Sequence, residues 1–191
     1  MDTRTALLDS AERAARQRGF DAFSYADLAR DVGIRKASIH HHFPVKADLA
    51  FGLIERYAAR FSETLTDIDR GHLHAAGKLR AFHQVYRGAL AGGTQLCLCV
   101  SMSAGRDSFS ALVLEQLTQF HSNSAAWLAQ VFARGAEDGT VANINEASAE
   151  AHATLALMEG AQLIARAAED ITLFDRATAA FLLRLTPQRP H

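Results

Sequence analysis

The sequence predicts an all-α protein, and three observations lead to that prediction. Only three prolines occur in 191 residues, at Pro44, Pro187 and Pro190, so most of the chain lacks the strongest helix breaker. Apolar residues make up 49% of the chain and recur at three- and four-residue spacing, the period of a helix with one buried face. Alanine and leucine are abundant and runs of β-branched residues are missing, which also favours helices. We expect nine helices.

Composition limits the functions that the chain can have. Lys and Arg number 20 against 21 Asp and Glu, so a surface that attracts nucleic acid has to be local. Two cysteines are too few for a secreted disulfide scaffold and indicate a reducing compartment. The N-terminal residues carry charges where a signal peptide needs an apolar core, and no apolar run approaches the roughly 20 residues of a membrane helix. We therefore expect a cytoplasmic protein that does not enter a membrane.

Glycines close the first two predicted helices. The first spans about residues 4–18, where alanines and leucines recur on one face, and Gly19 follows it. Ser24 begins the second helix, because Asp27 stands three residues further on and completes a variant of the capping box. This second helix is short, since Gly33 ends it.

A proline separates the third predicted helix from the fourth. The third stops at Phe43, because the residue before a proline is pushed out of the helical region. The fourth is long and spans about residues 45–69, with apolar residues at helical spacing and Gly71 at its end. Val45 offers no side-chain cap for this helix.

The next three predicted helices form the middle of the chain. The fifth carries the apolar residues between Leu79 and Leu90 and is broken by Gly92 and Gly93. A short apolar helix over residues 95–104 holds both cysteines. Ser108 is the predicted N-cap of the seventh helix, which runs to about residue 138.

Capping pairs mark the last two predicted helices. Asn143 with Glu146 is the predicted start of the eighth, and Thr172 with Asp175 is the predicted start of the ninth.

The stretch "RKASIHHHFPVK", residues 35–46, carries the clearest functional signal. It contains three Lys or Arg residues, three histidines and no Asp or Glu. A basic run is often only a solvated helix face. Here, however, it lies in the second of two short helices that are joined by a tight glycine turn, which is the pattern of a helix-turn-helix. Small outward residues, Ala37 and Ser38, would let the helix approach a groove, so we expect a recognition helix for double-stranded DNA.

The three consecutive histidines, His40, His41 and His42, also raise the question of a metal site or a catalytic site. Neighbouring residues on a helix point about 100° apart, so three consecutive imidazoles do not converge on one ion. No nucleophile or paired carboxylate stands beside them in the sequence. We therefore expect no metal, no cofactor and no enzyme activity here.

The N-terminal segments "LLDSAERAARQRGF" and "FSYADLARDVGIRKASIHHHFPVKADL" resemble the TetR family of transcriptional repressors. The resemblance covers about the first fifty residues and includes the "HF" pair at His42 and Phe43. It implies a nine-helix architecture with a helix-turn-helix domain over residues 1–45 and a ligand-binding and dimerisation domain over residues 46–191. It also implies a ligand-responsive regulator, expected to be a repressor, that binds a palindromic operator as a homodimer. A small-molecule inducer, expected to be thiol-reactive in one version of this hypothesis, would release the DNA.

The resemblance also implies which residues contact DNA. They lie at the start of the second helix, along the third helix and at the start of the fourth: Ser24, Tyr25, Arg35, Lys36, Ala37, Ser38, His40, His41 and Lys46. His40 departs from the family pattern, because it stands where the family has a phosphate-contacting tyrosine. Lys46 matches the lysine that typically holds a phosphate.

Two further sets of residues belong to the expected regulatory domain. The expected dimer interface comprises Leu155, Met158, Gly160, Ala161, Ile164, Phe174, Phe181 and Leu182, and a close helix approach would explain Gly160. The candidate ligand pocket comprises Tyr57, Phe61, Phe82, Tyr86, Cys99, Met102, Phe109, Phe120, His121 and Trp127. An aromatic stripe at helical spacing is more often core than pocket, so both interpretations stay open for the second set.

The two cysteines can be interpreted as core residues or as a sensor. If Cys97 and Cys99 lie on one helix, their side chains diverge by about 200° and do not easily bond each other. At least one is then expected to be a buried small hydrophobe. The sharper hypothesis is a redox or electrophile sensor, in which one thiolate reacts and DNA is released. Metal binding with a histidine fits no zinc spacing.

Two functions of other classes remain as alternatives. One is a small helical enzyme, and the other is a helical adaptor that does not bind DNA. Salt-sensitive binding to DNA separates both from a regulator.

Overall fold

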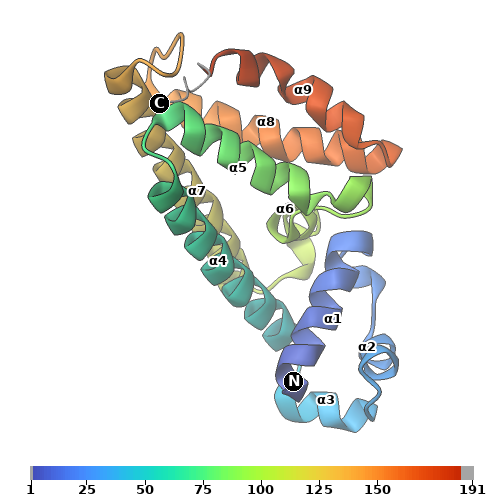
Figure 1. The fold of residues 1–191 in the computed structure, drawn as a ribbon. Helices are drawn as coiled ribbons and strands as arrows, with labels where there is room; N and C mark the ends of the chain where they lie inside the picture. Colours follow the sequence, from blue (N-terminus) through green and yellow to red (C-terminus); the bar gives the residue numbers. More distant parts are fainter. Residues whose placement is uncertain (1, 186–191) are drawn as a thin grey trace. The chain divides into compact units, whose positions relative to one another are not determined.

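The computed structural model describes residues 2–185, and within them it contains nine α-helices, as the sequence predicts. Figure 1 labels the helices in chain order. They are α1 (Thr3–Arg18), α2 (Tyr25–Val32), α3 (Lys36–His42), α4 (Lys46–Gly71), α5 (Ala75–Ala89), α6 (Leu98–Ser103), α7 (Ala111–Asp138), α8 (Ala147–Ala168) and α9 (Ile171–Leu183). The only strand-like pairing in the described residues is one isolated bridge between Val141 and Leu185.

The chain forms two compact units. The first comprises the described residues up to Arg60 together with Cys97–Phe120, and the second comprises Phe61–Leu96 and the described residues from His121 onward. This division cuts through α4 and α7 and does not follow the predicted boundary between residues 45 and 46. That boundary separates functions and stays a prediction.

In the first unit, α1, α2 and α3 enclose a small apolar core. Leu7 on α1, Leu28 on α2 and Ile39 on α3 are almost wholly buried. The α2 N-terminus has the predicted capping box, in which Ser24 and Asp27 each bond the other's backbone N–H. Gly33 ends α2 in the left-handed region at φ 76°, which explains why a glycine stands between the two short helices.

The first unit also contains α6, which packs against α1. The Ser101 hydroxyl donates a hydrogen bond of 2.7 Å to the carbonyl oxygen of Ala15. Leu98, Cys99 and Met102 on α6 are buried as well. Helix α1 therefore packs against α2 on one side and against the cysteine-bearing α6 on another.

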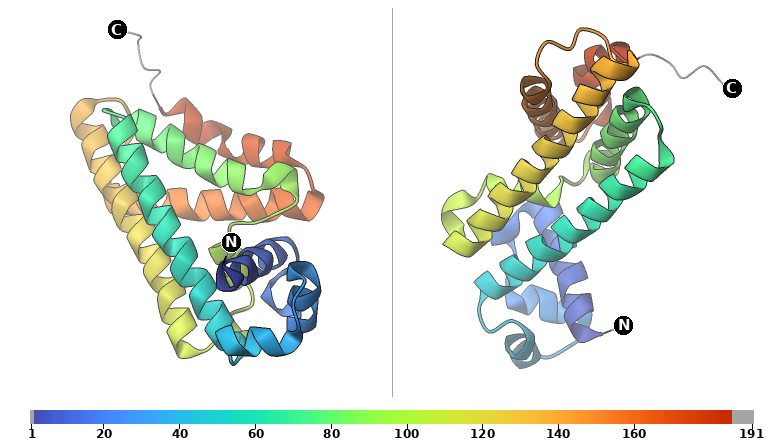
Figure 2. Two further views of the ribbon diagram at one scale, coloured as in Figure 1. Left: turned by 60° about the horizontal axis from the view of Figure 1, so that its bottom comes forward. Right: turned by 90° about the vertical axis from the view of Figure 1, so that its left-hand side faces the viewer.

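In the second unit, α8 and α9 lie side by side and α5 packs against both. Figure 2 shows the same pairing of α8 with α9 from a second direction. Polar contacts join these helices: the Gln162 side chain donates to the Tyr86 carbonyl oxygen at 2.7 Å, and Arg87 forms a bidentate pair with Asp175 at 2.7 and 2.9 Å. Among the described residues, no helix is long and apolar enough to cross a membrane.

The predicted starts of α6 and α7 are wrong. Helix α6 begins at Leu98 rather than near residue 95, because Gly92 and Gly93 adopt positive φ and Cys97 is extended at ψ 138°. Helix α7 begins at Ala111, and Ser108 instead ends a short 3₁₀ turn and donates its hydroxyl proton to Asp21.

The predicted caps of α8 and α9 are also wrong. Glu146 itself is the N-cap of α8 and accepts from the backbone N–H groups of Ser148 and Ala149, whereas Asn143 lies in the left-handed region at φ 58°. Asp170 caps α9 by accepting from the N–H of Thr172. In both places the cap is the acidic residue directly before the first helical residue, and it also complements the positive end of the helix dipole.

Candidate nucleic-acid interface and regulatory core

The outer face of α3 is polar, basic and exposed. Arg35 is its extended N-cap residue, and Lys36, Ala37 and Ser38 form its first turn. All four are exposed, whereas Ile39 is wholly buried and fixes the helix on the core. Neither Arg35 nor Lys36 forms an ion pair within residues 2–185. These side chains are therefore free to meet phosphate or base edges.

The three histidines take three different roles. His40 Nδ1 lies 3.1 Å from the Pro44 carbonyl oxygen, so this nitrogen carries the proton and Nε2 points away from that contact. His41 is exposed, and His42 is half-buried at 5.8 Å from the His41 ring. The histidine rings are thus separated by helical geometry, and His40 and His41 remain on the exposed side.

Tyr25 is placed differently from the expectation of a phosphate contact. Its side chain is buried, its hydroxyl donates to the Phe43 carbonyl oxygen at 2.9 Å, and its ring meets the His40 ring edge-on at 5.0 Å. Burial raises the pKa of Tyr25 to about 12, and the nearby Asp48 carboxylate adds to this effect. Tyr25 therefore holds the C-terminus of α3, and a direct contact with DNA through its hydroxyl is not supported.

Lys46 also differs from the expected phosphate-binding lysine. Its ammonium donates to the carbonyl oxygens of Phe20 and Phe23, both at 2.8 Å. The same ammonium lies over both phenyl rings, at 4.7 and 4.8 Å from their centroids. Burial lowers the pKa of Lys46, and Asp21 partly opposes this. Lys46 thus fastens the start of α4 to the turn between α1 and α2.

The missing side-chain cap at Val45 is partly replaced. The Val45 backbone N–H donates to the Asp48 carboxylate at 3.2 Å, which is one half of a capping box.

Ser24, a predicted DNA contact at the N-terminus of α2, is exposed. Its hydroxyl donates to Asp27 at 2.8 Å. Ser24 can therefore still face a phosphate at the N-terminus of α2.

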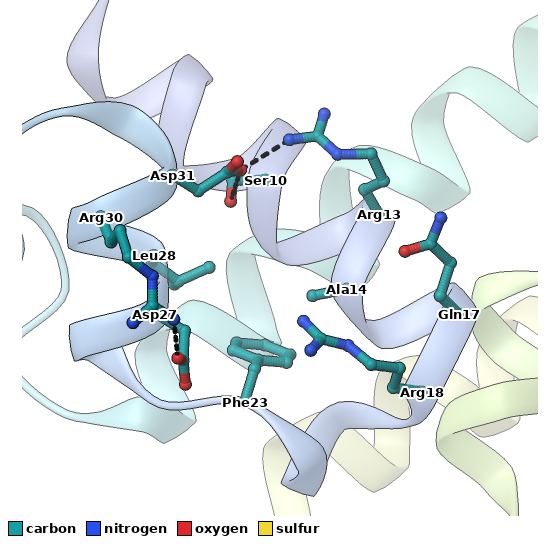
Figure 3. A pocket seen from close by; sticks show the side chains of 10 residues that line it. All are labelled: Ser10, Arg13, Ala14, Gln17, Arg18, Phe23, Asp27, Leu28, Arg30 and Asp31. Atoms are coloured by element: carbon teal, nitrogen blue, oxygen red, sulfur yellow. Dashed lines mark hydrogen bonds and ion pairs between the residues drawn. The ribbon is translucent and has the colours of Figure 1, made fainter.

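A polar hollow of about 420 Å³ lies between α1 and α2. Figure 3 shows Arg13 and Arg18 of α1 on one side of it and Asp27, Arg30 and Asp31 of α2 on the other. Arg13 donates to Asp31 at 2.6 Å, and the Ser10 hydroxyl donates to the same carboxylate. These contacts fix the angle between α1 and α2. Sequence reasoning missed them, because residues 18 and 21 positions apart carry no local pattern.

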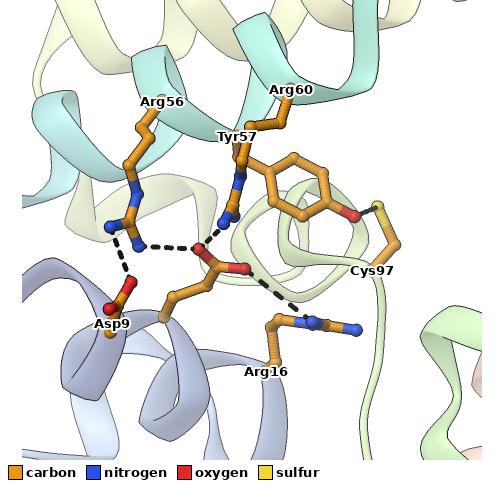
Figure 4. A network of polar contacts seen from close by, with 7 residues as sticks. Asp9, Arg16, Arg56, Tyr57, Arg60 and Cys97 are labelled. Atoms are coloured by element: carbon orange, nitrogen blue, oxygen red, sulfur yellow. Dashed lines mark hydrogen bonds and ion pairs between the residues drawn. The ribbon is translucent and has the colours of Figure 1, made fainter. Parts of the chain in front are cut away.

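A charged network joins α4 to α1 in the first unit, as Figure 4 shows. Arg56 donates to Asp9 at 2.7 Å and to Glu12 at 2.9 Å. Arg60 donates to the same Glu12 oxygen, and Arg16 pairs with the other oxygen at 3.8 Å. Glu12 is buried and is surrounded by three guanidinium groups. A buried carboxylate with such partners resists separation, so α4 and α1 are tightly joined here.

Tyr57 and the two cysteines lie beside this network. The Tyr57 hydroxyl donates to the Cys97 sulfur at 3.2 Å. The Cys99 side chain hydrogen-bonds to the Cys97 sulfur as well, so the two side chains meet. The expectation that they diverge is wrong, because Cys97 precedes α6 with an extended backbone and does not follow helical geometry. Both cysteines are almost wholly buried.

The predicted pocket residues fall into separate groups. In the first unit, the Tyr57 ring lies 6.0 Å from the Phe120 ring, while Phe109 instead packs on Phe20 at 5.2 Å. Cys99 and Met102 are buried on α6. Phe109 therefore supports the turn that follows α1, which its position in the sequence did not indicate.

In the second unit, four of the predicted residues form one aromatic cluster. The Phe82 ring lies 4.9 Å from Tyr86, 6.3 Å from Phe61 and 5.6 Å from Trp127, on which it stacks. The Trp127 indole N–H donates to Asp69 at 2.9 Å, and this carboxylate also receives Lys78. The cluster has the contacts of a packed core, so its role as a pocket stays a prediction.

His121, the remaining predicted residue, faces an acid. Its Nε2 lies 3.2 Å from a Glu159 carboxylate oxygen on α8. A separate hollow of about 630 Å³ in this unit is lined by residues outside the predicted set, namely Ile68, His72, Gly77, Arg80, Ala81, Gln84 and Val85. Neither His121 nor the aromatic cluster lines it.

The predicted dimer residues divide by burial. Five of them are buried within the protomer, and their part in a dimer interface stays a prediction: Leu155, Met158, Ala161, Phe174 and Phe181. Helical spacing shows that a residue belongs to the apolar face of its helix. It does not show whether the core of the same chain or a partner chain covers that face. Gly160, Ile164 and Leu182 are at least partly exposed, and Leu163 and Leu183 add apolar surface to α8 and α9. Apart from its chain neighbours and the backbone of its own helix, nothing in the described residues lies within 4 Å of where a Cβ at Gly160 would stand, so no close approach of another helix within the protomer explains this glycine.

Comparison with known proteins agrees with this arrangement. Residues 7–53 match the family described as bacterial regulatory proteins, tetR family. A transcriptional regulator of the TetR family from Agrobacterium tumefaciens has a structure that superposes with a TM-score of 0.90 at 30% identity, over 96% of this chain and 97% of that one. The reduced form of Escherichia coli NemR superposes with a TM-score of 0.84 at 25% identity, over 99% of this chain and 100% of that one.

Sequence relatives extend the similarity beyond the N-terminal segment. The transcriptional repressor NemR of Escherichia coli K12 is 25% identical over 185 residues, which cover 93% of this chain and 91% of NemR. The transcriptional regulator TtgR of Pseudomonas putida is 32% identical over 74 residues, which cover 36% of this chain and 35% of TtgR.

Proposed function

The chain belongs to the TetR family of transcriptional regulators, and from that membership we propose that it is a repressor that binds a palindromic operator as a homodimer. The observation that carries the proposal is the outer face of α3. It presents Arg35, Lys36, Ala37 and Ser38 outward on a helix that Ile39 and the capped α2 hold in place. A preformed basic helix of this kind suits the major groove.

Two copies are required for a specific site. A helix as short as α3 reads only one half-site, and two-fold operators match two-fold dimers. The exposed apolar side chains Leu163 and Ile164 on α8 support this helix as the dimer surface, since a contiguous apolar face is costly in water. The proposed partners are therefore operator DNA and a second copy, and the proposed place of action is the cytoplasm.

Release from DNA is proposed to follow the binding or reaction of a small molecule in the helical core. Helix α4 is continuous from Lys46 to Gly71, and Lys46 fastens its start to the turn that precedes α2. A displacement of α4 therefore changes the position of the recognition element. An inducer acts by favouring the conformation that does not fit both half-sites, and a thiol-reactive inducer at Cys97 is one such ligand.

The test is a gel-shift titration against the DNA that flanks the gene, at several salt concentrations. We expect affinity to fall steeply with salt, and Lys36→Ala to weaken binding and lower the salt dependence by about one phosphate contact. Arg70→Ala is the matched control, because Arg70 is an exposed cation at the opposite end of α4. Binding that does not respond to salt, or an equal loss in both variants, contradicts the proposal and favours an adaptor or an enzyme.

A further inference from the structure

We propose that Cys97 and Cys99 are a two-thiol redox pair that a small neutral hydroperoxide converts into an intrachain disulfide, with Tyr57 as the residue that prepares Cys97. Cys97 is the attacking thiol and Cys99 the resolving thiol. The disulfide itself is independent of DNA binding. Its meaning as a release signal rests on the proposed function.

The contacts around Cys97 are those of an activated thiol, because hydrogen bonds to its sulfur stabilise the thiolate. The Tyr57 hydroxyl donates to its sulfur at 3.2 Å, and the Cys99 side chain bonds to the same sulfur. The extended backbone at Cys97 brings the two side chains together, which a continuous helix over both residues prevents. Figure 4 shows Tyr57 and Cys97 facing each other beside the charged network.

These hydrogen bonds also favour the reactive form of the thiol. The bond from Cys99 is the largest cause that lowers the pKa of Cys97 from 9.0 to about 7, and the bonds from Tyr57 and from backbone N–H groups outweigh the opposing effect of burial. Burial raises the pKa of Tyr57 well above 10, and the neighbouring thiols add to this, so the phenol keeps its proton as a donor. The contacts around Cys97 thus increase its thiolate share relative to that of a free thiol.

The reaction balances with a hydroperoxide as the only added reagent. The Cys97 thiolate attacks one peroxide oxygen, the O–O bond breaks, and the leaving alkoxide or hydroxide takes a proton to give alcohol or water. Cys97 is now a sulfenic acid. The Cys99 sulfur then attacks the Cys97 sulfur, the S–O bond breaks, and the hydroxide leaves as water with the Cys99 proton. Two thiols lose two electrons, and the peroxide gains them.

Burial selects the oxidant. Cys97 is 2% exposed and Cys99 is wholly buried, so a bulky electrophile does not reach either sulfur without opening the fold. Hydrogen peroxide and small alkyl hydroperoxides are neutral and little larger than water. A probe such as N-ethylmaleimide should therefore react far more slowly with the native protein than with the unfolded chain.

The product acts on the junction between α4 and α1. Disulfide formation removes the thiolate to which Tyr57 donates, and Tyr57 follows Arg56 directly on α4. Arg56 and Arg60 of α4 bind Asp9 and Glu12 of α1. Helix α1 in turn contacts α2 through the ion pair between Arg13 and Asp31. Oxidation therefore reaches the recognition element through groups that touch one another within the first unit.

Peptide mass mapping after hydrogen peroxide treatment tests the chemistry. The chain has only two cysteines, and both lie between Arg87 and Arg106 in one tryptic peptide. We expect this peptide to lose about 2 Da and to regain both thiols with dithiothreitol. Covalent dimers on a non-reducing gel, or a peptide with two thiols still free to alkylate after unfolding, overturn the proposal.

A matched pair of variants separates the two thiols. Cys99→Ser should stop at the sulfenic acid, which dimedone traps on Cys97, whereas Cys97→Ser should give no dimedone adduct and no disulfide. Equal trapping in the two variants contradicts the assignment of attacking and resolving roles. Serine is nearly isosteric with cysteine, so both variants should keep the fold. Thermal unfolding of each variant checks this.

Tyr57→Phe tests the positioning residue. It keeps the ring and removes the hydrogen bond, so peroxide oxidation should slow about tenfold at pH 7, the effect of one hydrogen bond to a charged group. The difference from wild type should vanish at a pH high enough to ionise the thiol without help. A rate that is equal at every pH removes Tyr57 from the mechanism. A gel shift with oxidised protein then tests release separately: a disulfide without release contradicts the regulatory link but not the thiol chemistry.

Discussion

At the residue scale, the most informative side chain is Lys46. It stands where the family resemblance implies a phosphate contact, yet its ammonium is used by two carbonyl oxygens and two aromatic rings. The position and the residue type were predictable from the sequence, because they follow from the motif. The partners were not, because Phe20 and Phe23 approach Lys46 only through the turn between α1 and α2.

The first prediction contrasts Lys46 with Lys36. Lys46→Met keeps the aliphatic stem but leaves two carbonyl oxygens without their donor, so the free energy of unfolding should fall by about 2 kcal/mol. Lys36→Met removes an exposed ammonium and should change it by less than about 0.5 kcal/mol. Urea unfolding measures both. A stability of the Lys46 variant equal to wild type shows that the buried contacts contribute little.

The second prediction concerns His83, whose imidazole is 2% exposed between α5 and α9. Its Nε2 lies 2.8 Å from the Thr178 hydroxyl, and its ring lies 5.2 Å from that of Phe174. Burial is the largest cause that lowers the pKa of His83 below 6.5; Asp175 opposes this, and Arg87 and Arg80 reinforce it. The folded state therefore prefers the neutral imidazole.

The sign of the pH dependence follows from that preference. The unfolded chain binds the His83 proton more tightly, so the stability from this group is complete above pH 6.5 and is lost as pH falls through the lower folded-state pKa. Thermal midpoints measured from pH 8 to pH 5.5 should fall more for wild type than for His83→Gln, which keeps a polar group without the titration. Parallel curves would falsify this role for His83.

At the element scale, helix existence was predictable and helix starts were less so. The apolar period runs over many residues, so it identifies each helix even where single positions are ambiguous. A start depends on one residue. Glu146 caps α8 from the position directly before the helix, whereas the predicted cap Asn143 lies three residues earlier. Asp170 caps α9 in the same way, and the predicted cap Thr172 lies inside that helix. The cysteine helix was misplaced for a similar reason, since the glycine loop before it continues to Cys97.

The third prediction tests that glycine loop. Gly93 has φ 101°, and a Cβ there would stand 2.9 Å from the carbonyl carbon of Glu169 at the end of α8. Gly93→Ala should therefore lower the free energy of unfolding by about 2 to 4 kcal/mol. Gly88→Ala is the control: Gly88 lies within α5 with open space around it, and alanine should stabilise the helix by up to about 1 kcal/mol. Equal changes in the two variants contradict this reading of the loop.

At the scale of the whole molecule, the contacts that build function cross between helices far apart in the sequence. Glu12 receives Arg56 and Arg60 from α4, more than forty residues away, and no sequence period reports such a pairing. The dimer surface shows the same limit. Helix α8 carries apolar residues on two sides, and the sequence does not say which side is covered by its own chain. The expected dimer interface therefore contains both half-buried Gly160 and buried Met158.

The fourth prediction concerns that surface. Ile164 is 56% exposed on α8, and Ile164→Glu should convert a dimer of about twice 20.7 kDa into a monomer, because burying a charge at an apolar interface is unfavourable. Leu73→Glu places the same charge at another exposed apolar residue, outside α8 and α9, and should leave the dimer intact. Light scattering after size exclusion gives both masses. A dimeric Ile164 variant excludes this face as the interface centre.

Trp127 gives the molecule a spectroscopic property. It is the only tryptophan of the chain, it stacks on Phe82, and its indole N–H is held by Asp69. Intrinsic emission at long excitation wavelength therefore comes from the second unit alone, whereas far-ultraviolet circular dichroism records the helices of both units. Denaturation followed by the two signals in parallel therefore tests whether the units unfold together, without any label. Coincident midpoints of fluorescence and circular dichroism show one cooperative transition, and different midpoints show that one unit unfolds before the other.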